Sequence, residues 1–175
     1  NSNGDSIYHL KNDRRIKLFI TGGTIDKTYN RLTGELDFSN GTHIPKMLKE
    51  ARFYGDYSLD VLMLKDSLDM DELDREKISK ACENYEGRRI VITHGTDTMI
   101  QTAKFVNKNL EKTIVFTGAM KPLSFGNSDG YYNVGHAISA AQLLPSGIYI
   151  SMNGRIFNPD NVRKKREFGI FEEIK

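Results

Sequence analysis

Hydroxyl-bearing side chains follow two short apolar runs in this chain. Residues 16–20 lead into Thr21-Gly22-Gly23-Thr24-Ile25, and residues 89–93 lead into His94-Gly95-Thr96-Asp97-Thr98. A strand that ends in hydroxyls and a carboxylate, just before a helix, presents those groups where chemistry can occur. Threonine hydroxyls in such a place suit covalent or direct attack on an acyl group.

Other kinds of site are less favoured by the same residues. No set of Cys, His and carboxylate residues has the spacing of metal ligands, and no Gly-Lys-Ser/Thr loop is present to cradle a phosphate. We therefore expect neither a metal nor a cofactor. Polar residues also follow two further predicted strands, at Asp66-Ser67 and at Thr117.

Each of these residues has a structural interpretation as well. Ser, Thr and Asp before a helix are preferred N-caps, and Gly22-Gly23 can simply form a tight turn. His94 is explained as well by a buried, hydrogen-bonded side chain as by catalysis. What favours a functional role is the coincidence of both threonine segments at one predicted sheet edge.

Apolar runs and helical periodicity alternate along the chain and predict the elements that position these groups. Strands are predicted at residues 16–20, 59–64, 89–93, 113–117 and 147–152. Apolar helical faces are predicted around residues 44–51 and over 71–85, 99–110 and 131–144, with Leu73 among the inward residues of 71–85. Residues 26–39 are polar and lack periodicity, which predicts a mobile functional loop.

Strands that are apolar on both faces and alternate with helices predict a parallel sheet covered on both sides. The expected fold is a three-layer α/β/α doubly wound domain, flavodoxin-like or Rossmann-like, with a mostly parallel sheet. A length of 175 residues fits one domain, which we assign to residues 16–175. Residues 1–15 are polar and are interpreted as a leader.

The composition of the chain indicates in which compartment the protein works and which classes of partner it can bind. A net charge of +2 creates no global field that argues for nucleic acid, although the basic residues 163–166 leave RNA binding as a weaker alternative. The single cysteine, Cys82, excludes an intramolecular disulfide and fits a reducing compartment. No apolar run reaches the ~18 residues of a transmembrane helix. We expect a cytoplasmic protein without membrane or nucleic-acid partners.

The two threonine segments resemble, in this order, the two signatures of the bacterial-type L-asparaginases. Thr21-Gly22-Gly23-Thr24-Ile25 matches the first signature, and residues 94–99 match the second. Gly118-Ala119-Met120-Lys121-Pro122 resembles a third family segment, and Ser128-Asp129-Gly130 with Asn133 resembles a fourth. The similarity runs from about residue 16 to the end, so the resemblance implies the fold of the family's N-terminal domain.

The resemblance implies catalytic roles for matching residues. Thr24 corresponds to the family's nucleophilic threonine, which either attacks directly or positions a water, and Tyr29, in the predicted loop, corresponds to the tyrosine that assists it. Thr96 corresponds to the second catalytic threonine. The catalytic lysine is matched best by Lys164, within a basic run, ahead of its neighbour Lys165.

The same resemblance implies how the substrate is held. Asp97 corresponds to the aspartate that binds the substrate's amino group, and Ser67 to the serine that binds its α-carboxylate. A lysine beside Thr96, kept neutral by partial burial, could accept the hydroxyl proton, although Asp97 favours the charged lysine. We expect the backbone N–H groups of Gly23 and Thr96 to stabilise the oxyanion.

The implied reaction is hydrolysis of L-asparagine to L-aspartate and ammonia. Most family members carry a second domain that supplies an acidic residue, whereas this chain resembles a short-chain subgroup with one domain. Leu68 stands where the secreted enzymes have a glutamine. An asparaginase-glutaminase of broader specificity and a weakly active or non-catalytic amino-acid-binding domain remain alternatives. We expect a homodimer or homotetramer, with helix 131–144 as the contact.

Overall fold

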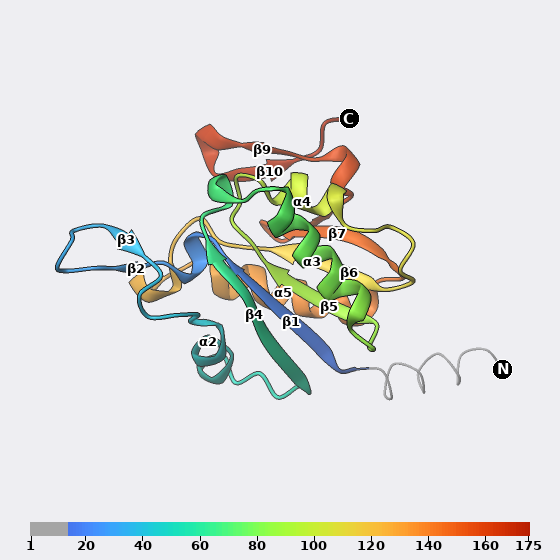
Figure 1. Cartoon of the computed structure of the whole chain (residues 1–175), viewed down its shortest axis with the longest axis horizontal. Coiled ribbons are helices and arrows are strands. Elements are labelled where there is room, and N and C mark those ends of the chain that lie inside the picture. Colours follow the sequence, from blue (N-terminus) through green and yellow to red (C-terminus); the bar gives the residue numbers. More distant parts are fainter. Residues whose placement is uncertain (1–13) are drawn as a thin grey trace.

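The computed structural model describes residues 14–175, so the predicted leader lies outside the described residues except for Arg14 and Arg15. A six-stranded sheet forms the centre of the molecule (Figure 1). Its strands, in spatial order, are β4 (Tyr57–Lys65), β1 (Ile16–Gly22), β5 (Arg89–Thr93), β6 (Thr113–Thr117), β7 (Gly147–Met152) and β8 (Arg155–Phe157).

Five of these strands run parallel, and β8 pairs with β7 in the antiparallel sense at one edge. The first strand, β1, lies between β4 and β5, so the chain leaves it first toward one edge and then toward the other. The carboxyl ends of β1 and β5 therefore border the topological switch point, where ligands bind in open α/β sheets.

Helices cover both faces of the sheet and confirm the predicted α/β class. Helices α2 (Ile44–Glu50) and α5 (Gly130–Leu143) pack on one face, with Val91 and Val115 of the sheet in the same apolar cluster. Helices α3 (Glu72–Asn84) and α4 (Met99–Phe105) cover the other face, in front in Figure 1. No helix among residues 14–175 is long and apolar enough to cross a membrane.

Two details of the predicted helices are wrong. Leu73 is exposed, because the capping box of Asp71 and Asp74 starts α3 in a phase that turns Arg75 inward instead, where Arg75 Nε donates to Thr102 Oγ1 (3.1 Å). The helix predicted over 99–110 ends at Phe105, because the following residues form a turn in which the Asn107 side chain accepts an N–H.

The predicted loop at residues 26–39 contains a small hairpin that projects from the body (Figure 1). Strands β2 (Thr28–Tyr29) and β3 (Leu36–Asp37) pair across a turn in which Asn30 N–H donates to Glu35 O (2.8 Å). The sequence did not predict this hairpin, because its residues are polar and each strand contains only two residues.

A second hairpin follows the sheet and was not predicted. It pairs β9 (Arg163–Lys165) with β10 (Ile170–Glu172) and lies over the carboxyl ends of the strands. Phe171 and Val162 are buried in the same apolar cluster as Ile92 and Met99. Burial of a phenylalanine side chain contributes about 1.5–3 kcal/mol, so Phe171 anchors this hairpin to the sheet.

Candidate active site

The two threonine segments touch each other at the switch point. A Cβ atom added to Gly23 would lie 2.5 Å from both Cα and N of Gly95. Gly23 also has a φ of 85°, a backbone conformation that residues with a side chain rarely adopt. Glycine at this position is therefore what lets the Thr24 turn lie directly against the Thr96 turn.

Two further strand ends close around the same point. A Cβ atom on Gly95 would lie 2.6 Å from Cβ of Ser67, which follows β4. A Cβ atom on Gly118, which follows β6, would clash with the carbonyl of His94. The polar ends of β1, β4, β5 and β6 thus converge at one edge of the sheet.

Lys164 connects the second turn to the end of the chain. Its Nζ donates to Thr96 Oγ1 (2.8 Å) and to Asp97 Oδ1 (2.8 Å), and its side chain is only 12% exposed. Lys165, the alternative in the sequence, points elsewhere, with its Nζ 4.0 Å from Glu172 Oε2 and over the ring of Phe168. Of the two lysines, Lys164 is the one that contacts Thr96.

Alternation along β9 explains this choice. Lys164 pairs in register with Phe171, so both side chains lie on the face of the hairpin that packs onto the sheet. Arg163 and Lys165 lie on the opposite face, where both contact Glu172. The buried phenylalanine therefore directs Lys164 toward Thr96.

Asp97 is surrounded by cations. The hydrogen bond from Lys164 is the largest cause that lowers the pKa of this carboxyl group, and the charges of Lys164, Arg166 and Lys27 add to it. Arg166 Nη2 lies 3.4 Å from the same oxygen, Oδ1. Within the described residues, all contacts of Asp97 use Oδ1, which leaves Oδ2 available to a ligand.

Thr24 begins a short 3₁₀ helix, η1 (Thr24–Asp26), and is partly buried. Its carbonyl accepts the N–H of Lys27 (3.1 Å), which fixes the turn. Among residues 14–175, no hydrogen-bond partner is present for the Thr24 hydroxyl. A hydroxyl without a structural partner, held against the Thr96 turn, can be used by a substrate.

Thr96 has a second contact that sequence reasoning missed. Its hydroxyl donates to Met120 Sδ (3.6 Å) while it accepts from Lys164. Asp129 holds the Met120 turn by accepting the N–H groups of Met120 (2.8 Å) and Lys121 (3.0 Å), and Asn133 Nδ2 donates to Gly118 O (2.9 Å). The third and fourth family segments thus support the wall beside Thr96.

Two expected ligand-binding groups are already engaged. The N–H of Gly23 donates to Lys65 O (2.9 Å), so it is not a free oxyanion donor in this conformation. Ser67 is buried, and its Oγ accepts the N–H of Thr98 (3.2 Å). The N–H of Thr96 has no partner within the described part of the chain, so it can still serve as an oxyanion donor.

His94 is a buried structural residue in this geometry. Its Nδ1 lies 2.7 Å from Gly95 O and its Nε2 lies 2.8 Å from Thr102 Oγ1. Burial lowers its pKa to about 4, so the ring is neutral near pH 7. Of the two interpretations left open above, the structure favours the buried, hydrogen-bonded histidine.

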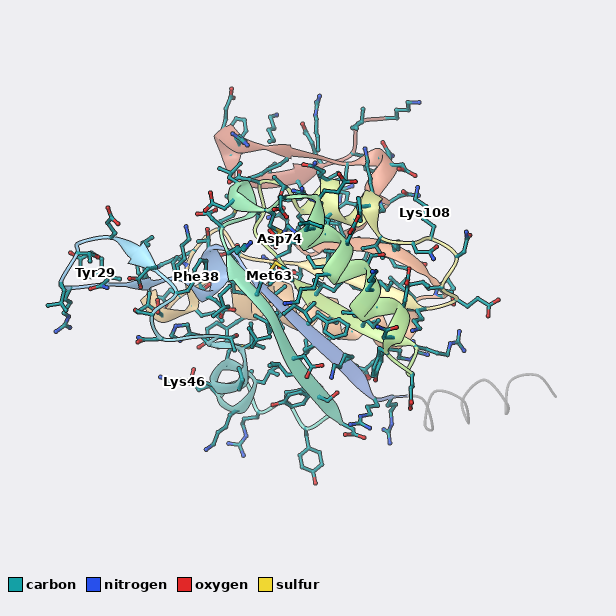
Figure 2. All side chains as sticks on the ribbon, in the orientation of Figure 1. Tyr29, Phe38, Lys46, Met63, Asp74 and Lys108 are labelled. Carbon is teal, nitrogen blue, oxygen red and sulfur yellow. The ribbon has the colours of Figure 1, made fainter. Side chains whose placement is uncertain are left out.

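Tyr29 does not join the other residues. It lies on the β2–β3 hairpin, away from the sheet, and is 54% exposed (Figure 2). Phe38 of the same segment lies closer to the sheet. A movement of this hairpin would be needed to bring Tyr29 to Thr24.

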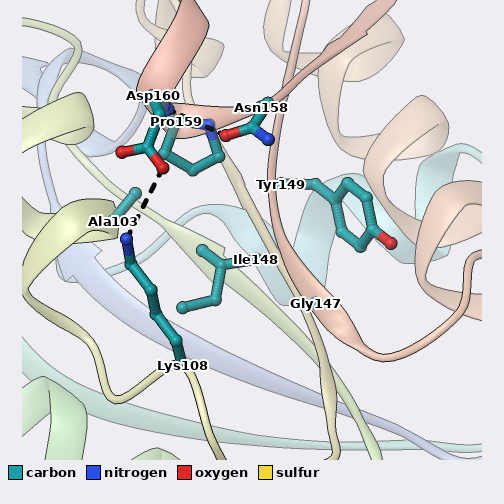
Figure 3. Close-up of a pocket in the computed structure, with 8 residues that line it drawn as sticks. All are labelled: Ala103, Lys108, Gly147, Ile148, Tyr149, Asn158, Pro159 and Asp160. Carbon is teal, nitrogen blue, oxygen red and sulfur yellow. Dashed lines mark hydrogen bonds and ion pairs between the residues drawn. The ribbon is translucent and has the colours of Figure 1, made fainter.

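A pocket at the surface lies elsewhere and includes none of the predicted site residues (Figure 3). It has a volume of about 270 Å³, and the exposed ion pair of Lys108 and Asp160 (3.5 Å) stands at it. Its lining is Ala103, Lys108, Gly147, Ile148, Tyr149, Asn158, Pro159 and Asp160. Within residues 14–175, no group of three or more His, Cys, Asp or Glu residues is placed to hold a metal ion.

Comparison with known proteins points to one family. The family model described as Asparaginase, N-terminal, matches residues 15–171. The "Probable L-asparaginase periplasmic" of Haemophilus influenzae is 30% identical over 92% of this chain and 49% of its own length. The chain therefore spans about half the length of the curated relatives it matches.

Solved structures agree with the sequence comparison. The thermostable L-asparaginase from Thermococcus kodakarensis superposes with a TM-score of 0.79 and 28% identity, over 91% of this chain and 51% of that one. The "Probable Cytoplasmic L-asparaginase" from Campylobacter jejuni gives a TM-score of 0.76 at 27% identity, over 91% of this chain and 52% of that one.

Proposed function

The chain belongs to the asparaginase family, and from this premise we propose that it hydrolyses L-asparagine to L-aspartate and ammonia. The observation that carries the proposal is the contact of Lys164 with both Thr96 and Asp97, directly beside the turn of Thr24. A hydroxyl, an amine and a carboxylate in this order are the parts of an activated-nucleophile site.

In the proposed reaction, the Thr24 hydroxyl attacks the carbon of the side-chain amide. Thr96 and Lys164 relay the proton, since Lys164 Nζ is already hydrogen-bonded to Thr96 Oγ1 and can receive it when the amine is neutral. As the tetrahedral species collapses, Lys164 returns the proton through Thr96 to the amide nitrogen, the C–N bond breaks, and the nitrogen leaves as ammonia. Water then cleaves the ester to Thr24 and restores its hydroxyl.

We propose the remaining roles on the same grounds. The N–H of Thr96 donates to the developing oxyanion, and Oδ2 of Asp97 accepts the substrate's ammonium. Closure of the β2–β3 hairpin brings Tyr29 to Thr24 once the substrate is bound. Ser67 contributes to the α-carboxylate site after its hydrogen bond with Thr98 rearranges.

Ammonia release from L-asparagine tests the proposal. Thr24→Ala and Thr96→Ala should each abolish it, whereas Thr33→Ala, in the exposed turn of the β2–β3 hairpin, should not. Full activity in either site variant would refute the role of that threonine. Tight binding of asparagine without ammonia release by the wild type would instead indicate an amino-acid-binding domain.

An asparaginase-glutaminase of broader specificity is the second candidate. Leu68 follows Ser67 at the site and is 65% exposed, so no polar side chain at this position limits the length of the substrate. Comparison of kcat/KM for L-glutamine and L-asparagine decides between a selective and a broad enzyme.

We also propose that residues 16–175 act as one catalytic domain, because Phe171 packs into the core that contains β5. We also propose that the protein self-associates through α5. This helix buries Val134 and Ala137 against the sheet but leaves the large apolar side chains of Tyr132 and Leu143 exposed. Light scattering that detects only monomer at micromolar concentration would contradict an oligomer.

A cytoplasmic location is a further proposal. The Campylobacter jejuni protein supports it by name, whereas the Haemophilus influenzae protein is named as periplasmic. Fractionation of the source cells, with ammonia release from asparagine as the marker, distinguishes the two compartments.

A further inference from the structure

A second ion pair connects the segments that carry Thr24 and Ser67. Lys27, three residues after Thr24, places its Nζ on Oδ2 of Asp66, the residue before Ser67. The lysine side chain is only 17% exposed, and its Nζ lies 5.9 Å from the centre of the Phe38 ring. The pair thus joins the end of β4 to the turn that carries Thr24.

The backbone of Lys27 is held from both directions. Its N–H donates to Thr24 O (3.1 Å), and its carbonyl accepts the hydroxyl of Ser124 (2.8 Å). The position of the lysine is therefore coupled directly to that of Thr24. The pair lies beside the two threonine turns, because Lys65, on one side of Asp66, accepts the Gly23 N–H (2.9 Å) and Ser67, on the other side, lies against Gly95.

Two ion pairs therefore involve the segments that carry the reacting hydroxyls, Lys27–Asp66 next to Thr24 and Lys164–Asp97 next to Thr96. Lys164 is committed to Thr96 and Asp97, whereas Lys27 has a single ionic partner among the described residues. An α-amino acid carries one carboxylate and one ammonium. If the Lys27–Asp66 pair separates, Lys27 can bind the carboxylate and Asp66 can bind the ammonium. Each charge exchanges one partner for another, so none is left buried and unpaired.

We propose that Lys27 and Asp66 form the subsite for the α-groups of the substrate, with Lys27 binding the α-carboxylate and Asp66 sharing the ammonium with Asp97. This inference rests on the proposed function. It restricts the substrate class to side-chain amides whose α-amino and α-carboxyl groups are both free. It also supplies polar contacts on the side of the site where Leu68 offers none.

Lys27→Met is the informative variant, because methionine keeps the apolar contact with Phe38 and removes the charge. Lys17→Met is its matched control. Lys17 forms an equivalent pair with Asp60 (2.7 Å), is 12% exposed, and lies 5.6 Å from the Phe19 ring, but it stands at the amino end of β1. Each variant leaves one aspartate without its lysine, either Asp66, just after β4, or Asp60, within β4.

Steady-state kinetics with L-asparagine and its α-methyl ester separate binding of the carboxylate from a general structural effect. Lys27→Met should raise KM for asparagine by about 10- to 100-fold, the usual effect of losing a charged hydrogen bond, with kcat changed far less. Its KM for the ester should equal that of the wild type. Asp66→Asn should raise KM for asparagine but not for succinamate, which has no amino group.

Equal KM values for asparagine in Lys27→Met and Lys17→Met would overturn the inference, as would equal losses on the acid and on the ester. If the wild type releases no ammonia, the proposed function fails, and calorimetry with L-aspartate still tests the subsite. Weaker aspartate binding in Lys27→Met than in Lys17→Met would then support Lys27 as the carboxylate ligand, and equal affinities would refute it.

Discussion

Replacing Lys164 by methionine removes two hydrogen bonds and keeps most of the volume of the side chain. Thr96 Oγ1 loses its donor, and Asp97 Oδ1 keeps only Arg166 at 3.4 Å. The pKa of Asp97 should rise, because the hydrogen bond from Lys164 is the largest cause that lowers it. The backbone of β9 should stay in place, since the buried side chain of Phe171 anchors the hairpin.

The expected loss is catalytic rather than structural. A positioned general base contributes about 10²–10⁴-fold to a rate, so kcat for asparagine should fall by that factor, or by about 2.7–5.4 kcal/mol in activation free energy. A partly buried hydrogen-bonded ion pair contributes about 1–2 kcal/mol to folding. Lys164→Met should therefore remain folded while its turnover nearly disappears.

The assay is ammonia release under substrate saturation, with urea unfolding measured on the same samples. Lys165→Met is the control, because it removes the neighbouring charge, which contacts only Glu172 and the Phe168 ring in the described structure. Its kcat should stay within about threefold of the wild type, as expected for an exposed charge. Similar kcat losses in both variants, or a Lys164→Met enzyme above about a tenth of wild-type kcat, would refute the proposed relay.

Three other perturbations test the geometry. Gly23→Ala should destabilise the fold by more than Gly34→Ala in urea unfolding. Positive φ costs both variants about 1–3 kcal/mol, but only Gly23 also has a ψ of 176° and meets backbone within 3 Å; equal losses would contradict the close approach. Burial lowers the pKa of His94 from 6.5 to about 4. As the pH falls through this range, the histidine of the unfolded chain takes up a proton while that of the folded chain stays neutral. The free energy of unfolding of the wild type should therefore decrease by about 3 kcal/mol between pH 6.5 and 4. His94→Gln should flatten that part of the stability–pH curve, and an unchanged slope would assign the effect to other groups. Phe171→Ala should cost about 3–5 kcal/mol and reduce kcat as Lys164→Met does, since the hairpin loses its anchor; normal turnover in folded protein would contradict that coupling.

The central sheet was predictable because its signal is local. Residues 89–93, 113–117 and 147–152 are apolar on both faces, and β5, β6 and β7 have those bounds. Carboxyl ends of neighbouring parallel strands lie at one edge, so the proximity of the two threonine segments followed from the fold class.

The parts that were missed depend on contacts between distant residues. Three-residue strands such as β9 carry too little periodicity to be recognised, and a run of basic residues is usually exposed. Only the burial of Phe171 shows that Lys164 and not Lys165 turns inward. The Lys27–Asp66 pair likewise joins residues 39 positions apart, and neither residue has a local pattern that indicates the other.

The late position of Lys164 has a consequence for the order in which the protein matures. Every strand of the sheet is in the chain by Phe157, and both threonine turns can already be in contact at that stage of synthesis. Lys164, which contacts the Thr96 turn, comes later in the chain, and the hairpin that holds it packs onto the sheet only once Phe171 is present. A nascent chain can therefore form its central sheet before the proposed catalytic lysine is held in place, and the proposed site is assembled only with the β9–β10 hairpin.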